Sequence, residues 1–142
     1  MKKILAIDDN QINLELLHQI VKMYYPDFLF LKTISGKRGI ELAMEESPEI
    51  ILLDILMPEM DGIEASLKIR EWEQANGKSR IPIIAMTANA MQEDRNRCRA
   101  VGMDDYISKP VQSKILEEIL SRWVMTASAD SRVQAAGVQA EG

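Results

Sequence analysis

The chain has 142 residues, of which 46% are hydrophobic, and its formal net charge at pH 7 is −5. This length fits one domain with enough apolar side chains to fill a core. The acidic balance gives unaided nucleic-acid binding no electrostatic support. The single cysteine, Cys98, excludes an intramolecular disulfide and agrees with a reducing compartment. No apolar run approaches the roughly 18 residues that a membrane span needs, so we expect a soluble, cytoplasmic protein without a membrane partner.

Short apolar runs alternate along the chain with longer segments of helical composition. The apolar runs predict strands at residues 3–7, 28–33, 50–54, 81–87 and 105–109. The segments between them predict helices at residues 11–24, 36–46, 62–75 and 90–101, followed by a last amphipathic helix ending near Val124. Crossovers of this length join parallel strands. The pattern therefore predicts an α/β fold, a doubly wound five-stranded parallel sheet with the (βα)5, flavodoxin-like strand order 2-1-3-4-5.

The composition changes near the end of the chain. From about Thr126 the sequence reads "TASADSRVQAAGVQAEG", which has too few large apolar residues for a second core. We therefore place one domain at residues 1–125 and expect a flexible tail or linker stub at residues 126–142.

Polar side chains follow four of the predicted strands. Asp8 and Asp9 follow the first, Asp54 ends the third, Thr87 ends the fourth and Lys109 ends the fifth. In doubly wound sheets, ligands bind outside the carboxyl ends of the strands, where the strand order reverses. A buried carboxylate without partners is costly. The run of apolar residues that leads into Asp54 therefore predicts a site built for charge.

The kinds of side chain indicate the chemistry of this site. Clustered carboxylates repel one another unless a cation joins them, and oxygen ligands without His or Cys favour a hard ion such as Mg²⁺, or Mn²⁺ in its place. A carboxylate can itself attack phosphorus and form an aspartyl phosphate. Phosphoryl transfer depends mainly on positioning and charge neutralisation, which a cation and an ammonium group supply.

Four segments resemble the characteristic blocks of the receiver domains of two-component response regulators. These are "ILAIDDN", "LLDILMPEMDG", "PIIAMTANA" and "GMDDYISKP", and the likeness covers residues 3 to about 124. Their wording is most similar to receivers attached to hybrid sensor kinases or working in phosphorelays. The resemblance implies a signalling module rather than a metabolic enzyme, with self-catalysed, Mg²⁺-dependent phosphorylation and dephosphorylation of its own aspartate.

The resemblance also implies a role for each acidic position. Asp54 would be the phosphoacceptor and a metal ligand. Asp9 would bind Mg²⁺ directly, and Asp8 would hold a metal-bound water. The backbone carbonyl of Leu56 would be a further ligand.

Four further positions would bind the phosphoryl group or respond to it. Lys109 would pair with the phosphoryl oxygens, while the Thr87 hydroxyl and the Ala88 backbone would close on the group. Tyr106 would be the switch aromatic that moves as Thr87 moves.

Other positions would have structural or kinetic roles. The Lys109–Pro110 peptide would be cis, and Gly62 would shape the loop after the nucleophile. Leu56 and Asn89, two positions after the nucleophile and the threonine, would flank the approach of the hydrolytic water. Because Leu56 has no hydrogen-bonding group and Asn89 is not a base, we expect a comparatively long-lived phosphoaspartate.

The implied partners are a sensor histidine kinase or a histidine phosphotransfer domain as donor, with no direct binding to nucleic acid. A downstream protein would bind the face formed by the fourth helix, fifth strand and fifth helix, or the phosphate would be passed on. Three other functions fit the sequence less well. An aspartate-nucleophile phosphohydrolase usually has a second acidic residue at the position of Leu56. A flavin- or nucleotide-binding domain would need a loop that can hold a phosphate in place of "DDNQIN". The presence of Asp9, Asp54, Thr87 and Lys109 argues against a pseudo-receiver that serves only as a scaffold.

Two residues have simpler interpretations. His18 lies off the apolar stripe of its predicted helix, which favours a surface residue over a phosphohistidine. Cys98 shares a helical face with Val101, which favours a small buried hydrophobe over a redox sensor.

Overall fold

The computed structural model describes residues 2–57, 60–88 and 92–136, and its side chains are described except at 92–94 and 125–136. Within these residues five parallel strands form one sheet, in the order β2-β1-β3-β4-β5 that the sequence predicts. The strands are β1 (Lys3–Ile7), β2 (Leu29–Thr33), β3 (Ile50–Asp54), β4 (Ile83–Thr87) and β5 (Asp105–Ser108). The predicted fold class is therefore confirmed.

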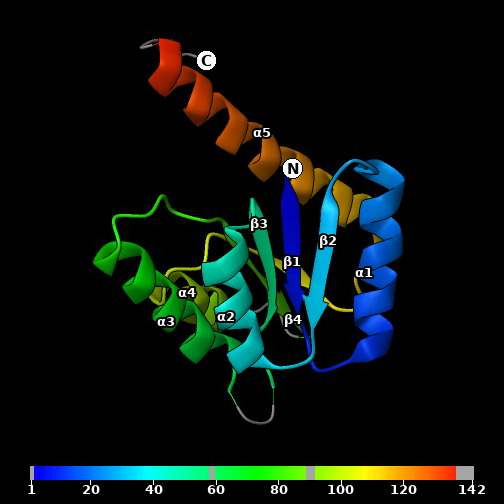
Figure 1. Ribbon diagram of the computed structural model, residues 1–142. Helices are drawn as coiled ribbons and strands as arrows, with labels where there is room; N and C mark the ends of the chain where they lie inside the picture. Colours follow the sequence, from blue (N-terminus) through cyan, green and yellow to red (C-terminus); the bar gives the residue numbers. More distant parts are fainter. Residues whose placement is uncertain (1, 58–59, 89–91, 137–142) are drawn as a thin grey trace.

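Helices cover both faces of this sheet (Figure 1). They are α1 (Gln11–Tyr24), α2 (Gly36–Glu46), α3 (Gly62–Ala75), α4 (Gln92–Ala100) and α5 (Ser113–Ala136). Buried side chains of α1 and α5 share one core cluster, and those of α2, α3 and α4 share the other. Among the described residues, no helix combines the length and the apolar character needed to cross a membrane.

The strands supply side chains alternately to the two clusters. In β1, Ile4 and Ala6 face α1 and α5, while Leu5 and Ile7 face α2 and α3. All five residues of β3 and all five of β4 are buried. Strands buried on both faces must be apolar throughout, which explains the near-continuous apolar runs in the sequence.

The helix ends follow from local capping. The Asn10 side chain caps α1 by accepting a hydrogen bond from the Asn13 backbone N–H at 3.0 Å. The last helix differs from the prediction, because α5 continues to Ala136 and passes beyond the sheet (Figure 1). Residues 126–136, predicted as a flexible tail, are therefore helical. They contain neither Pro nor Gly, and small residues such as Ala favour helix even where they cannot build a core.

A second group of charged residues lies at the amino ends of strands β4 and β5, opposite the carboxyl ends. Arg70 of α3 pairs with Glu73 at 2.8 Å and with Asp104 at 2.8 Å, and it also donates to the Gly102 carbonyl. Asp104 in turn accepts a hydrogen bond from the Ile83 backbone N–H. This partly buried network, the Arg70 cluster, joins α3 to the first residue of β4 and to the segment before β5.

Candidate functional site

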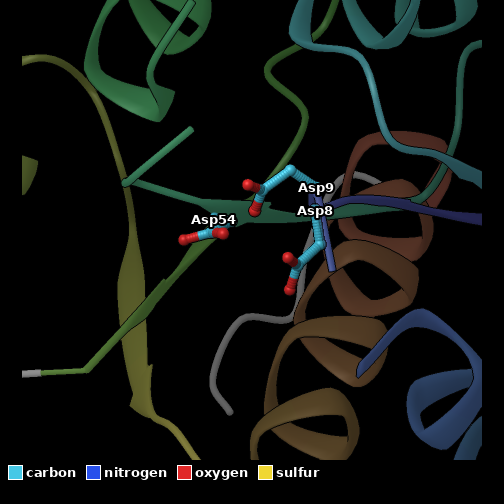
Figure 2. Close-up of side chains that lie close together, drawn as sticks. All are labelled: Asp8, Asp9 and Asp54. Carbon is cyan, nitrogen blue, oxygen red and sulfur yellow. The ribbon is translucent and has the colours of Figure 1, made fainter. Parts of the chain in front are cut away.

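Three carboxylates meet at the carboxyl end of the sheet. Asp8 and Asp9 follow β1, and Asp54 is the last residue of β3. One oxygen of each lies within 4.8 Å of the others, and Figure 2 shows the three side chains lying close together. Asp8 is completely buried and Asp54 is 3% exposed, whereas Asp9 is exposed to solvent.

The pairing of the strands explains why these residues meet. Ile7 is aligned with Leu53 across the β1–β3 pair, so the residue that follows each of them, Asp8 and Asp54, lies at the same level. The N-terminus of α3 also passes close to this point. A Cβ atom on Gly62 would lie 2.5 Å from the Asp54 backbone carbonyl, so only glycine allows this approach. This is a physical reason for the glycine that ends the "MPEMDG" motif.

Asp8 is held by three donors. Its Oδ1 accepts a hydrogen bond from the Asn10 backbone N–H at 2.9 Å. Its Oδ2 accepts from the Asn13 side-chain amide at 2.6 Å and lies 3.1 Å from the Lys109 ammonium. These contacts explain how a completely buried carboxylate is tolerated.

Asp54 has two donors. Its Oδ1 accepts a hydrogen bond from the Leu56 backbone N–H at 3.0 Å, and its Oδ2 lies 3.2 Å from the Lys109 ammonium. Lys109 follows β5, so its ammonium reaches across the end of the sheet and bridges Asp8 and Asp54.

The crowding of charge alters the acidity of these groups. Burial raises the pKa of Asp54 to about 6, and the neighbouring Asp8 carboxylate adds to the increase, against the hydrogen bond from Leu56 and the charge of Lys109. Burial lowers the pKa of Lys109, but the carboxylates of Asp54 and Asp8 outweigh it, so the net change is upward. The folded protein therefore disfavours the ionised form of Asp54, mainly because the carboxyl group is buried.

An open cleft of about 410 Å³ gives access to Asp54. Its walls are formed by Asp9, Asn10, Asp54, Leu56, Ala88 and Lys109. Leu56 is 69% exposed and presents an apolar side chain at the mouth of the cleft. The cleft thus combines an acidic floor, one ammonium group and an apolar rim.

The remaining predicted residues lie near the cleft or beyond it. Thr87 ends β4, is 4% exposed and accepts a backbone hydrogen bond from Lys109 at 2.8 Å. Tyr106 of β5 packs against the core cluster that contains the buried side chains of α2, α3 and α4. The Arg95 guanidinium lies 4.3 Å from the centre of the Tyr106 ring. The Lys109–Pro110 peptide is cis, as the resemblance implies. Asn89 lies outside the described residues, as does Pro58 of the "MPEMDG" loop.

The structure also tests the two simpler interpretations. Cys98 is buried, as predicted. His18 is half-buried rather than a surface residue, because its ring stacks on Phe30 with 4.8 Å between the ring centres. This stacking uses an apolar neighbour on β2, which the helical pattern of α1 alone does not reveal.

Asn13 is the residue of the site that the sequence motifs do not indicate. The available signal is its position, since Asn13 lies four residues before the buried Leu17 and seven before the buried Ile20, on the apolar face of α1. A polar side chain on that face needs a partner, and the partner is Asp8.

The donor set fits a hard divalent cation. Three carboxylates offer oxygen atoms within 4.8 Å of one another, two of them, Asp9 and Asp54, line the open cleft, and the described part of the cluster contains no His or Cys ligand. Lys109 is the ammonium that contacts this cluster, and it brings one positive charge to three carboxylates. Asp9, exposed on the cleft wall, is the carboxylate best placed to receive a cation from solvent.

A doubly wound parallel sheet with an acidic cluster and a lysine beside the central aspartate defines an α/β domain whose binding site lies at the carboxyl ends of the strands, where the strand order reverses. Residues 4–121 match the family model of the response regulator receiver domain. The chain belongs to this family, whose members are signalling modules of two-component and phosphorelay systems.

Relatives include both isolated and attached receivers. The chain is 38% identical over 122 residues to hybrid signal transduction histidine kinase L of Dictyostelium discoideum, covering 85% of this chain and 7% of that protein. It is 34% identical over 121 residues to the polar-differentiation response regulator DivK of Brucella ovis, covering 84% of this chain and 94% of that protein. The chain therefore spans a small part of the hybrid kinases it matches, but nearly all of DivK.

Solved structures agree with this assignment. The receiver domain of sensor histidine kinase PA1611 from Pseudomonas aeruginosa, which has a magnesium ion in its active-site cleft, is 33% identical with a TM-score of 0.75, covering 87% of this chain and 97% of that one. A receiver domain in the Saccharomyces cerevisiae complex of Ypd1 with Ssk1 gives a similar match. It is 26% identical with a TM-score of 0.82, covering 87% of this chain and 89% of that one.

Proposed function

We propose that Asp54 accepts a phosphoryl group from a phosphohistidine donor in a Mg²⁺-dependent reaction. The observation that carries this proposal is the pairing of a nearly buried carboxylate with the Lys109 ammonium, at 3.2 Å, next to two further carboxylates and on the wall of an open cleft. An Asp54 oxygen would attack phosphorus as the bond to the donor imidazole nitrogen breaks, and the imidazole would leave with the electron pair of that bond.

The residues of the cleft have separate tasks in this reaction. Lys109 already contacts Asp54, so its ammonium is positioned to pair with an oxygen of the incoming phosphoryl group. Asp8, Asp9, Asp54 and the Leu56 carbonyl would hold the cation. Bound there, Mg²⁺ would neutralise charge between the carboxylates and the phosphoryl oxygens. The Thr87 hydroxyl and the Ala88 backbone N–H would complete the contacts, since Ala88 lines the cleft.

The donor in this proposal is a histidine kinase or a histidine phosphotransfer domain. Two comparisons support it, namely the hybrid kinases among the relatives and the similar receiver that was crystallised with the phosphotransfer protein Ypd1. Whether this chain acts alone or as part of a longer protein does not alter the chemistry proposed for Asp54.

The proposed output surface is the face formed by α4, β5 and α5. On β5 the Tyr106 ring contacts Arg95 of α4, whereas the preceding Asp105 accepts hydrogen bonds from Arg122 and Trp123 of α5, both at 2.8 Å. Successive residues of one strand thus contact different helices. A displacement of β5 at the phosphorylation site would therefore be passed to both helices.

Intact-mass measurement with acetyl phosphate tests the proposal. We expect the wild-type protein to gain one phosphoryl group with Mg²⁺ and none with excess chelator. Asp54→Asn should gain none under either condition, whereas the exposed-site control Asp27→Asn should behave as the wild type does. Equal incorporation by Asp54→Asn and the wild type would refute the proposal.

A further inference from the structure

We propose that Asn13 of α1 is a positioning residue of the acid cluster, which holds Asp8 for the cation and leaves Lys109 available to Asp54. This inference rests on the proposed function and adds a residue to that site. It is carried by the contact of 2.6 Å between the Asn13 amide and Asp8 Oδ2.

The contacts of Asp8 show why a second side-chain donor matters. Asp8 is completely buried, so no solvent compensates its charge when a protein donor leaves. Asn13 and Lys109 both contact its Oδ2, at 2.6 Å and 3.1 Å. When Lys109 turns toward a phosphoryl group on Asp54, Oδ2 keeps the Asn13 amide and Oδ1 keeps the Asn10 backbone N–H. Asp8 therefore remains hydrogen-bonded while Lys109 moves.

Lys109 is shared almost equally between its two carboxylates. Its ammonium lies 3.1 Å from Asp8 and 3.2 Å from Asp54. Without Asn13, Asp8 Oδ2 would depend on Lys109 alone among the donors described for it, and the ammonium would be drawn away from Asp54. Asn13 thus sets how Lys109 divides its contacts.

A neutral amide is suited to this task. It orients the carboxylate without adding a positive charge, so it does not repel a cation bound to the same cluster. Hydrogen-bonding partners of this kind fix the orientation of metal-binding groups, and their loss typically weakens metal affinity about 10- to 100-fold.

The fold also holds Asn13 in place. Its backbone N–H donates to the side chain of the capping residue Asn10 at 3.0 Å. Its amide also lies 3.8 Å from the Met86 sulfur on β4. The first turn of α1 is therefore fixed relative to the sheet, and the amide points at Asp8 as a consequence.

The experiment compares Mg²⁺ binding by the wild type with binding by Asn13→Leu and Asn13→His, measured by isothermal titration calorimetry and checked by Mn²⁺ electron paramagnetic resonance. Asn13→Leu removes the donor, and we expect its Mg²⁺ affinity to fall by about tenfold. At about pH 8.5, where an ordinary imidazole is neutral, Asn13→His places an N–H at the same δ position without a positive charge and should recover part of that loss. The control Gln19→Leu, on the exposed side of the same helix, should stay within about twofold of the wild type.

A second measurement separates positioning from simple metal loss. At saturating Mg²⁺, Asn13→Leu should still be phosphorylated more slowly by acetyl phosphate, since Lys109 is held by Asp8. If Asn13→Leu does not fold, Asn13→Ala takes its place. Mg²⁺ affinity and phosphorylation rate equal to those of Gln19→Leu would overturn the inference. If the wild type bound Mg²⁺ and was phosphorylated while Asn13→Leu was unaffected, the proposed function would stand and only the role of Asn13 would fail.

Discussion

Replacing Asp54 by asparagine should make the metal-free protein more stable at neutral pH. The side chain keeps its shape, but one negative charge leaves a cluster of three carboxylates. Burial and the Asp8 carboxylate raise the pKa of Asp54 from its ordinary value of 3.8 to about 6. The ionised side chain therefore opposes folding, and a neutral amide does not.

The pKa shift sets the size and the pH range of the effect. The increase of the pKa from 3.8 to about 6 corresponds to about 3 kcal/mol. Because the cleft is open to water, we expect screening to reduce this to about 1–2 kcal/mol. Between pH 3.8 and about 6 the folded protein holds a proton that the unfolded chain has lost, so the stability of the wild type falls as the pH rises through this range. The full penalty is present above about pH 6 and absent below the unfolded pKa.

Urea denaturation in the presence of a chelator measures this difference. At about pH 7.5 the free energy of unfolding of Asp54→Asn should exceed that of the wild type by about 1–2 kcal/mol, and the difference should shrink toward zero near pH 4. Asp9→Asn is the matched control, since Asp9 is exposed and its neutralisation should have a smaller effect. Added Mg²⁺ should narrow the gap, because it stabilises the wild type by binding to the folded state.

Two results would contradict this reasoning. Asp54→Asn could be no more stable than the wild type at about pH 7.5, or its advantage could be the same at about pH 4. Either would mean that the charge of Asp54 is fully compensated by Lys109 and the backbone, and that the cluster does not need a cation for electrostatic reasons.

Three further predictions concern other parts of the molecule. Arg70→Met should lower the free energy of unfolding by about 3–5 kcal/mol, because it takes the buried Glu73 carboxylate's ion-pair partner away and leaves Asp104 with Arg80 alone of its two arginine partners. The exposed-pair control Arg38→Met should cost less than about 1 kcal/mol, and equal costs in urea denaturation would refute this role of Arg70. Arg95→Gln removes the cation over the Tyr106 ring and should speed amide exchange in α4 by about two- to fivefold; unchanged exchange would show that this contact does not hold the helix. Leu56→Asn should shorten the lifetime of the phosphoaspartate after donor removal, by about tenfold for each 1.4 kcal/mol taken from the barrier, and an unchanged lifetime would place the control of water access elsewhere.

The sequence by itself determined the architecture of this protein and the membership of its acidic cluster. Strands buried on both faces must be apolar along their whole length, so their runs stand out, and crossovers of helical length require them to be parallel. The carboxyl ends of parallel strands lie at one edge, so residues that follow strands are brought together whatever the details of packing. Asp8, Asp54 and Lys109 could be placed in one site on this basis alone.

The tertiary structure decided how the charges within that site are shared. The contact of Asn13 with Asp8, the bridging position of Lys109 and the raised pKa of Asp54 depend on distances of about 3 Å between side chains from different elements. The Arg70 cluster could not be predicted for the same reason, since its residues lie on α3 and on the segment before β5, about 30 residues apart in the sequence. Hydrophobic periodicity indicates which face of a helix or strand is buried. Whether two polar atoms form a hydrogen bond depends on a few tenths of an ångström in the distance between them. Distances of that precision are set only when the whole chain is packed.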